Sequence, residues 1–252
     1  MIGSLLSALA FLTRVPVPAS VHANEANLRR SSRWFPVVGL ILGGICAGVA
    51  WSATQRLSDS VAAVLVLTIE ALSTGALHLD GLADMADGFG GGRSREEVLR
   101  IMRDHAIGSY GAIALVLLLL FKAVCLFTLV RSQRGLLTIM LVPGISRWSI
   151  LFLSRIQPYA RTNETTARGT GSLCQHVSRF DLIFATACCS MFPFLFGTVQ
   201  TLACWAATVA VSLCVAKMCA RRIGGITGDT LGANVVISEA VQYAVALLVS
   251  PR

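Results

Sequence analysis

Long apolar runs constrain this chain more than any other feature of its sequence. A membrane-spanning helix needs about 20 apolar residues, and seven segments approach or exceed that length. Only 13% of the residues are charged, whereas about 25% is typical of soluble domains. This pattern predicts an all-α integral membrane protein and argues against a soluble enzyme, a nucleic-acid-binding module and a disordered chain. The expected spans are approximately 34–54, 61–79, 109–130, 135–153, 181–197, 198–216 and 231–250.

These spans predict a single transmembrane helical domain over residues 1–252, built as one bundle of about seven helices. The stretch before them, residues 1–33, opens with the apolar run Met1–Phe11. That run is too short to cross a bilayer, and no basic residues precede it as they would in a signal peptide. We therefore expect residues 1–33 to form an interfacial or re-entrant segment that stays on the mature protein.

The basic residues predict the orientation of the bundle. If alternate loops share one side of the membrane, 15 of the 21 Lys and Arg residues lie on one side and four on the other. Basic loops stay in the cytoplasm, so the long loops 80–108, 154–180 and 217–230 are expected there. Because nearly all polar content lies on that side, we predict an active site that faces the cytoplasm.

An acidic motif at the end of the second expected span is the most informative polar feature. Asp80, Asp84 and Asp87 are spaced to fall within about 60° of one helix face. Like charges at this spacing repel each other, and a helix C-terminus disfavours negative charge. A hard divalent cation such as Mg²⁺ resolves that conflict. The alternative is a solvated acidic helix end without a ligand.

A second polar cluster, Arg103-Asp104-His105, precedes the third expected span. Arg103 can hold a phosphate through paired hydrogen bonds, and Asp104 can add a carboxylate to a metal site. Juxtamembrane arginines often serve only to set topology, however, and a histidine such as His105 often lies at a surface without a catalytic role.

A third cluster, Thr227-Gly228-Asp229, precedes the last expected span. The N-terminus of a helix offers unpaired backbone N–H groups that bind phosphate, and Asp229 is a candidate metal ligand. The alternative is a helix cap followed by loop glycines.

Four charged residues fall inside or near the ends of expected spans: Glu70, Lys122, Arg147 and Glu239. Charges within a membrane are costly, and they are usually paired or functional. Lys122 can pair with Glu70 or Glu239 inside the bundle, or contact a substrate. Arg147 can reach an anionic ligand or extend its head group towards the interface.

Together these clusters indicate Mg²⁺-dependent phosphate chemistry on a membrane enzyme that uses a nucleotide-diphosphate-linked substrate. The alternative from another functional class is a divalent-cation transporter. The arginines argue against transport, because fixed positive charge holds a phosphate but repels a cation.

The chain contains five motifs in this order: Phe11–Pro18, Arg33–Gly39, His78–Gly88, Ile101–Gly108 and Gly224–Ala233. Together they resemble the cobalamin synthase (adenosylcobinamide-GDP ribazoletransferase) family. The resemblance runs over most of the chain, and the acidic and Gly-Asp-Thr motifs are its most specific parts. The acidic spacing is also similar to that of CDP-alcohol phosphotransferases, which we keep as the alternative enzyme class.

The resemblance implies a multi-pass enzyme of the bacterial inner membrane that requires Mg²⁺. A hydroxyl of α-ribazole, or of its 5′-phosphate, attacks adenosylcobinamide-GDP, and GMP leaves. The implied partners are these two substrates and the lipid bilayer, and no binding of nucleic acid is expected. The resemblance leaves open whether the protein forms a homo-oligomer.

The resemblance also suggests roles for individual residues. The expected metal ligands are Asp80, Asp84, Asp87, Asp104 and Asp229. The catalytic candidates are Asp84, Asp87 and Asp229, with Asp87 or Asp229 as the base. The expected substrate-binding residues are Arg14, Arg103, His105, Arg147, Arg161, Thr227 and Gly228.

Overall fold

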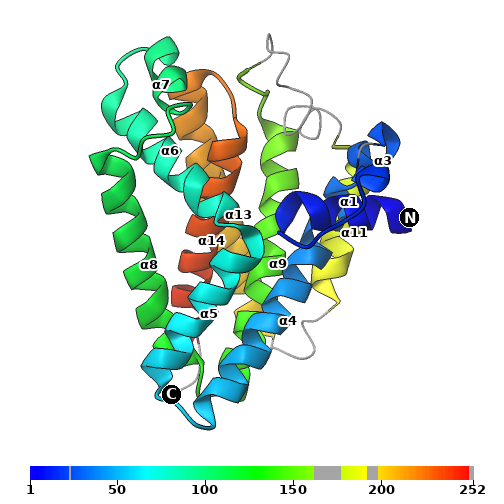
Figure 1. Cartoon of the computed structure of the whole chain (residues 1–252), viewed down its shortest axis with the longest axis vertical. Helices are drawn as coiled ribbons and strands as arrows, with labels where there is room; N and C mark the ends of the chain where they lie inside the picture. Colours follow the sequence, from blue (N-terminus) through cyan, green and yellow to red (C-terminus); the bar gives the residue numbers. More distant parts are fainter. Residues whose placement is uncertain (23, 162–176, 192–197, 250–252) are drawn as a thin grey trace.

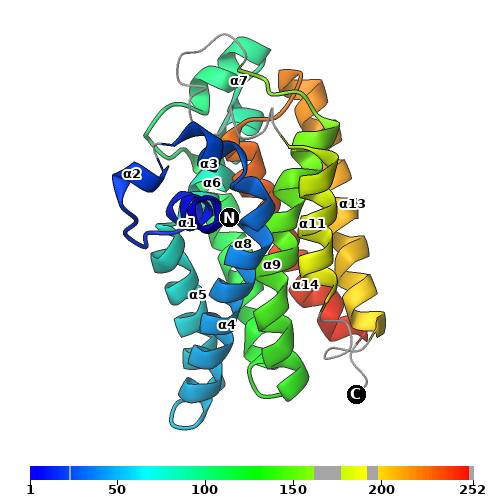
Figure 2. The ribbon, with the colours of Figure 1, turned by 90° about the vertical axis from the view of Figure 1, so that its right-hand side faces the viewer.

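Five long apolar helices form the frame of the computed structural model (Figures 1 and 2). The structure describes residues 1–22, 24–161, 177–191 and 198–249. Each of the five is long and apolar enough to cross a membrane, so the prediction of an all-α, multi-pass membrane protein is confirmed. These helices are α4 (Phe35–Thr54), α8 (Ser109–Leu129), α9 (Gln133–Ile156), α13 (Thr198–Ile223) and α14 (Gly228–Val249).

A sharp corner divides the second expected span. Helix α5 (Asp59–Thr74) and helix α6 (Leu77–Gly91) meet at 89°, so the prediction that a single span over 61–79 carries the acidic motif at its end was wrong. The corner is formed by Gly75 and Ala76, both in the left-handed region, with φ of 62° and 59°. The backbone N–H of Gly75 closes the last turn of α5, which is a common way for a helix to end at glycine.

The predicted total of seven spans is not confirmed. Helix α11 (Arg179–Ser190) covers the start of the fifth expected span but has only 12 residues. Residues 192–197, the rest of that expected span, lie outside the described residues. The described chain therefore contains five long helices and one bent pair, which counts as a sixth span or as a re-entrant loop.

Short helices gather at one end of the bundle. Helix α1 (Ile2–Leu12) is seen nearly end-on in Figure 2, so it lies across the long helices rather than along them. Its Ala8 and Leu12 are buried, and Trp34 donates a hydrogen bond to Ser4 at 3.1 Å. This arrangement fits an interfacial segment, although its depth in a membrane stays a prediction. The other short helices are α2 (Ala19–His22), α3 (Glu25–Arg29), the 3₁₀ helix η1 (Ser32–Trp34) and α7 (Arg95–Ile101).

The loops that were expected to share one side of the membrane begin or end at the same end of the bundle. Helix α7, the end of α9 and the start of α14 lie at the top of Figure 1, whereas the α4–α5 and α8–α9 turns lie at the bottom. We call the top the arginine-rich end, because Arg93, Arg95, Arg155, Arg221 and Arg222 belong to its segments.

Glycines let the long helices approach closely. A side chain at Gly39 or Gly43 of α4 would collide with the backbone of α9 at Pro143 or Met140. Association of helices in lipid depends on close packing of small residues. The spacing of these two glycines by four residues therefore allows α4 and α9 to pack along a shared face.

A network of charges is buried in the centre of the bundle. Lys122 of α8 donates to Glu70 of α5 at 2.8 Å and to Glu239 of α14 at 2.7 Å. Arg147 of α9 pairs with the other oxygen of Glu239, which Ser146 also contacts at 3.2 Å. Lys122, Arg147 and Glu239 are each at most 1% exposed. Two cations thus neutralise two carboxylates. Lys122 was predicted to pair with Glu70 or Glu239, and it contacts both.

The network predicts a large stability loss for Lys122→Met. Removal of one partner from a buried ion pair typically costs about 3–5 kcal/mol, because the remaining charge stays buried without a counterion. We expect a clearly lower melting temperature for the purified protein in detergent. The control is Lys217→Met, an exposed lysine of α13, and equal melting temperatures of the two variants would contradict the role of the network.

Candidate active site

Close packing of α6 against α14 brings two of the sequence motifs together. A Cβ atom at Gly81 would lie 2.6 Å from the carbonyl oxygen of Asp229, and one at Gly232 would lie 3.2 Å from the Cα atom of His78. A side chain at Gly81 would force the two backbones apart, and one at Gly232 would fit only tightly, so glycine favours this close approach. The acidic motif and the Gly-Asp-Thr motif, about 150 residues apart in the sequence, therefore form one site near the arginine-rich end.

Asp229 is held at the N-terminus of α14 by two side chains. Arg161 donates to its carboxylate at 3.2 Å, and the hydroxyl of Thr227 donates to the same oxygen at 3.2 Å. Thr227 and Thr230 also exchange hydrogen bonds that close the first turn of the helix. The side chain of Asp229 is 24% exposed and that of Arg161 16% exposed, so both remain partly accessible from the site.

Arg95 positions Arg161, although the sequence analysis counted Arg95 only as a topology charge. Its guanidinium donates to the carbonyl of Ile223 at 2.9 Å and to that of Ala160 at 2.8 Å. Backbone hydrogen bonds of 2.8 Å also join Ile226 to Pro158 and Ala160. These bonds hold the segment after α9 beside the segment before α14, so Arg161 reaches Asp229.

Asp80 and Asp84 lie one helical turn apart on α6 and therefore share a face. Asp84 interacts electrostatically with Asp229, Asp80 and Asp87, and also with the positive charge of Arg161. Asp80 is exposed and Asp84 is partly buried. The site thus carries more negative than positive charge at this point, which favours binding of a cation.

Asp87 has a different environment from the other two acids of its motif. It is 9% exposed, and its two carboxylate oxygens accept hydrogen bonds from the backbone N–H groups of Gly108 and Gly111, both at 2.8 Å. A Cβ atom on either glycine would collide with the carboxylate. Asp87 therefore caps the N-terminus of α8, where negative charge is favourable.

Two cavities adjoin the acidic residues. The first, which we call the open cavity, has an empty volume of about 1170 Å³ and lies between α6, α8 and the loop that follows α7. It contains charged groups of both signs. Its polar lining residues are Asp80, Asp84, Arg103, Asp104, His105 and Arg161.

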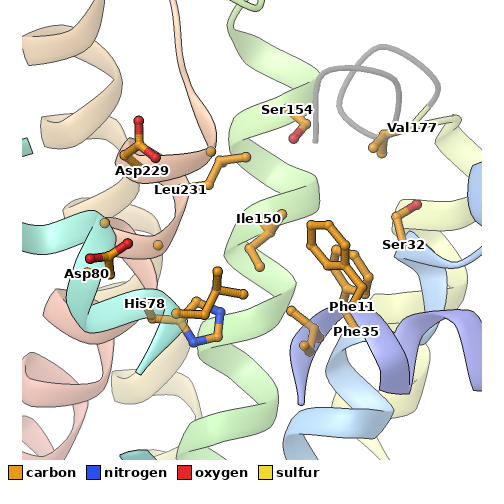
Figure 3. A pocket seen from close by; sticks show the side chains of 15 residues that line it. Phe11, Ser32, Phe35, His78, Asp80, Ile150, Ser154, Val177, Asp229 and Leu231 are labelled. Atoms are coloured by element: carbon orange, nitrogen blue, oxygen red, sulfur yellow. The ribbon is translucent and has the colours of Figure 1, made fainter. Parts of the chain in front are cut away.

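The second cavity, which we call the aromatic chamber, has an empty volume of about 680 Å³ and lies between α1, α4, α6, α9 and α14 (Figure 3). Asp80 lines both cavities, so both lie beside the acidic motif. The chamber residues used below are Phe11, Ser32, Phe35, His78, Ile150, Ser154 and Asp229.

A sequence model described as cobalamin-5-phosphate synthase matches residues 4–247 of the chain. The chain belongs to the cobalamin-5-phosphate synthase family. It is 36% identical to the adenosylcobinamide-GDP ribazoletransferase of Shewanella sp. (strain W3-18-1), over 98% of this chain and 95% of the relative. It is 39% identical to the Chlorobaculum tepidum protein of the same name, again over 98% and 95%. No solved structure matches the chain. The family resemblance that the motifs suggested is thus confirmed.

Three other site residues that the sequence predicted have different surroundings in this member of the cobalamin-5-phosphate synthase family. Asp104 lines the open cavity but accepts a hydrogen bond from the N–H of Ala106 at 3.1 Å. Arg14 lies at the α5–α6 corner, where its N–H donates to the carbonyl of Ser73 at 2.8 Å. Arg147 lies in the buried charge network and lines neither cavity.

Among the described residues, no group of three or more His, Cys, Asp or Glu side chains converges on a metal position. Mg²⁺ does not require such a cage, because it is commonly held by one or two carboxylates together with phosphate and water. Asp80 and Asp84 supply two hard oxygen donors beside the open cavity. Their chemistry therefore fits a magnesium ion that is completed by substrate.

The contacts of Asp87 predict that Asp87→Asn destabilises the protein. An amide in place of the carboxylate turns a donor towards one of the two backbone N–H groups and removes the charge that favours the helix N-terminus. Hydrogen bonds to charged groups contribute about 1.5–3 kcal/mol, so a melting temperature lower by several degrees is expected. Asp84→Asn is the matched control, since it relieves repulsion; a similar loss in that variant would be evidence against a capping role.

Proposed function

We propose that this protein is an adenosylcobinamide-GDP ribazoletransferase, an enzyme of cobalamin synthesis. The match to relatives of that name over nearly the full length of the chain carries the proposal. In this reaction a ribose hydroxyl of α-ribazole, or of its 5′-phosphate, forms a bond to the corrinoid-linked phosphorus. The bond between that phosphorus and the GMP oxygen breaks, so a phosphodiester forms and GMP leaves.

The open cavity is our candidate site for the diphosphate of adenosylcobinamide-GDP. Arg103, His105 and Arg161 line it together with the acidic residues. Arginine guanidinium groups bind phosphate oxygens in a paired geometry. Arg161 pairs with Asp229 in this structure, and transfer of its hydrogen bonds to a phosphate would leave the Asp229 carboxylate available to the substrate.

Asp80 and Asp84 are the residues that we propose to hold Mg²⁺. When bound, the ion stabilises negative charge on the transferring and leaving phosphate oxygens. The exposure of Asp80 and the partial exposure of Asp84 support this assignment, since water and phosphate must complete the coordination.

Asp229 is our candidate for the base that accepts the proton of the attacking hydroxyl. It lines the aromatic chamber together with Asp80, which also lines the open cavity. Asp87, the other candidate, already accepts two backbone hydrogen bonds, and a general base needs a free oxygen within reach of the hydroxyl. Asp229 also stands beside the N-terminal N–H groups of α14, which favour a nearby phosphate.

We also propose that the protein lies in the bacterial inner membrane with its arginine-rich end in the cytoplasm. Support comes from the strong asymmetry of basic residues between the two sides. The test uses Glu96→Cys, which is exposed at the arginine-rich end, in a variant whose native cysteines are replaced.

In intact cells, an impermeant thiol reagent should leave the Glu96→Cys protein unlabelled until the membrane is opened. The matched variant Gln55→Cys lies at the other end and should be labelled without opening. The reverse pattern would overturn the proposed orientation.

The activity itself is tested with purified protein, adenosylcobinamide-GDP, α-ribazole and Mg²⁺, by measurement of GMP release. Asp80→Asn and Asp84→Asn should each reduce the rate about 100-fold or more, because they remove charge that stabilises the transferring phosphate. Glu96→Gln, an exposed acid outside both cavities, should retain full activity.

Two results would contradict the proposal. Absence of GMP release by the folded wild-type protein would reject the activity, and release that is unaffected by chelation of Mg²⁺ would reject the metal. Turnover of a CDP-linked precursor instead would favour a CDP-alcohol phosphotransferase-like enzyme.

A further inference from the structure

We propose that the aromatic chamber binds the planar base of the ribazole nucleoside and holds its ribose beside Asp229. This inference rests on the proposed function, because it assumes that a ribazole is one of the two substrates. It adds a binding site for the base, for which the sequence predicted no residues. It also assigns the two substrates to different cavities.

The walls of the chamber suit a flat, uncharged ligand. Phe11 of α1 and Phe35 of α4 stack with ring centroids 5.5 Å apart and an angle of 3° between their planes. In Figure 3 the stacked rings lie across the chamber from His78 and Ile150. Most of the residues that line the chamber are apolar, as is usual for sites that bind small molecules.

Three buried polar atoms that point to a ligand line this same chamber. The hydroxyls of Ser32 and Ser154 and the Nε2 atom of His78 have no hydrogen-bond partner among the described residues. Ser32 is 2% and His78 is 4% exposed. Buried polar groups in folded proteins nearly always have partners, since an unsatisfied group costs about 1–3 kcal/mol. These atoms are therefore available to bind polar atoms of a ligand.

Among the parts of the two substrates, the ribazole base matches this combination best. Dimethylbenzimidazole has two fused aromatic rings, two methyl groups and no charge, and once it carries ribose only one ring nitrogen accepts a hydrogen bond. A serine hydroxyl or a histidine N–H can donate to that nitrogen. Guanine carries several donors and acceptors, and the corrin carries many amides, so neither fits a chamber with mostly apolar walls.

The position of the chamber agrees with the direction of the reaction. Asp80 and Asp229 lie on one side of it and the phenylalanine rings on the other (Figure 3). A base between the rings and Ile150 would direct its ribose towards Asp229. The diphosphate in the open cavity would then lie beyond Asp80, which lines both cavities, so the hydroxyl and the phosphorus would meet beside Asp80.

The test measures binding and needs no turnover. The purified wild-type protein and variants are titrated in detergent with α-ribazole and, separately, with GDP in the presence of Mg²⁺. Ile150→Trp fills the chamber and should raise the Kd for α-ribazole about tenfold or more, with the Kd for GDP unchanged. The matched control is Ile113→Trp on the exposed face of α8, which should change neither Kd.

A second variant covers the case in which Ile150→Trp does not fold. Ser32→Ala combined with Ser154→Ala removes two hydroxyls with little change in volume, and it should weaken binding of α-ribazole about fivefold or more. Binding of the analogue in which a carbon replaces the free ring nitrogen should be unaffected by this change.

The outcomes separate this inference from the proposed activity. If α-ribazole binds and Ile150→Trp weakens only that binding, the chamber assignment holds even where GMP release is absent. If the wild-type protein does not bind α-ribazole, or if the chamber variants weaken GDP binding instead, the assignment is wrong even where GMP release is normal.

Discussion

Neutralisation of charge inside the bundle is the constraint on which the rest of this structure depends. Lys122 joins α5, α8 and α14 through Glu70 and Glu239, and Arg147 adds α9 through the second oxygen of Glu239. An unpaired charge is costly in a low-dielectric interior, and its partners must hold good geometry to offset the cost of desolvation. The network therefore fixes the positions of these four helices along the bundle axis relative to one another. The N-termini of two of them, α8 and α14, contribute to the site.

The corner at Gly75 and Ala76 places the acidic motif where the site forms. Because α5 ends there and α6 turns by 89°, the acidic motif runs across the bundle rather than continuing along its axis. Gly81 then packs against the backbone of Asp229, and Asp87 caps α8. One short helix thus contacts α8 and α14, and its Asp80 lines both the open cavity and the aromatic chamber.

The arginines of the arginine-rich end do more than set topology. Arg95 joins the segment after α9 to the end of α13, and Arg222 of α13 donates to the carbonyls of Phe89 and Gly92 at the end of α6. Arg161 is left to face the acidic residues. Arg95 and Arg222 therefore support the structure of the site, whereas Arg161, in our proposal, binds phosphate.

Much of this protein could be predicted from its sequence alone. The apolar runs determined the membrane class and five of the spans, and the order of the motifs determined the family, because hydrophobicity and motif spacing are local properties. The corner at Gly75, the capping by Asp87 and the burial of Arg147 were decided by the tertiary structure. So was the chamber, which joins Phe11, Phe35, His78 and Ser154 from four different helices. Periodicity shows which face of a helix a residue occupies, but not which helix will pack against that face. Those features depend on contacts between residues far apart in the chain, and these exist only once the helices have packed.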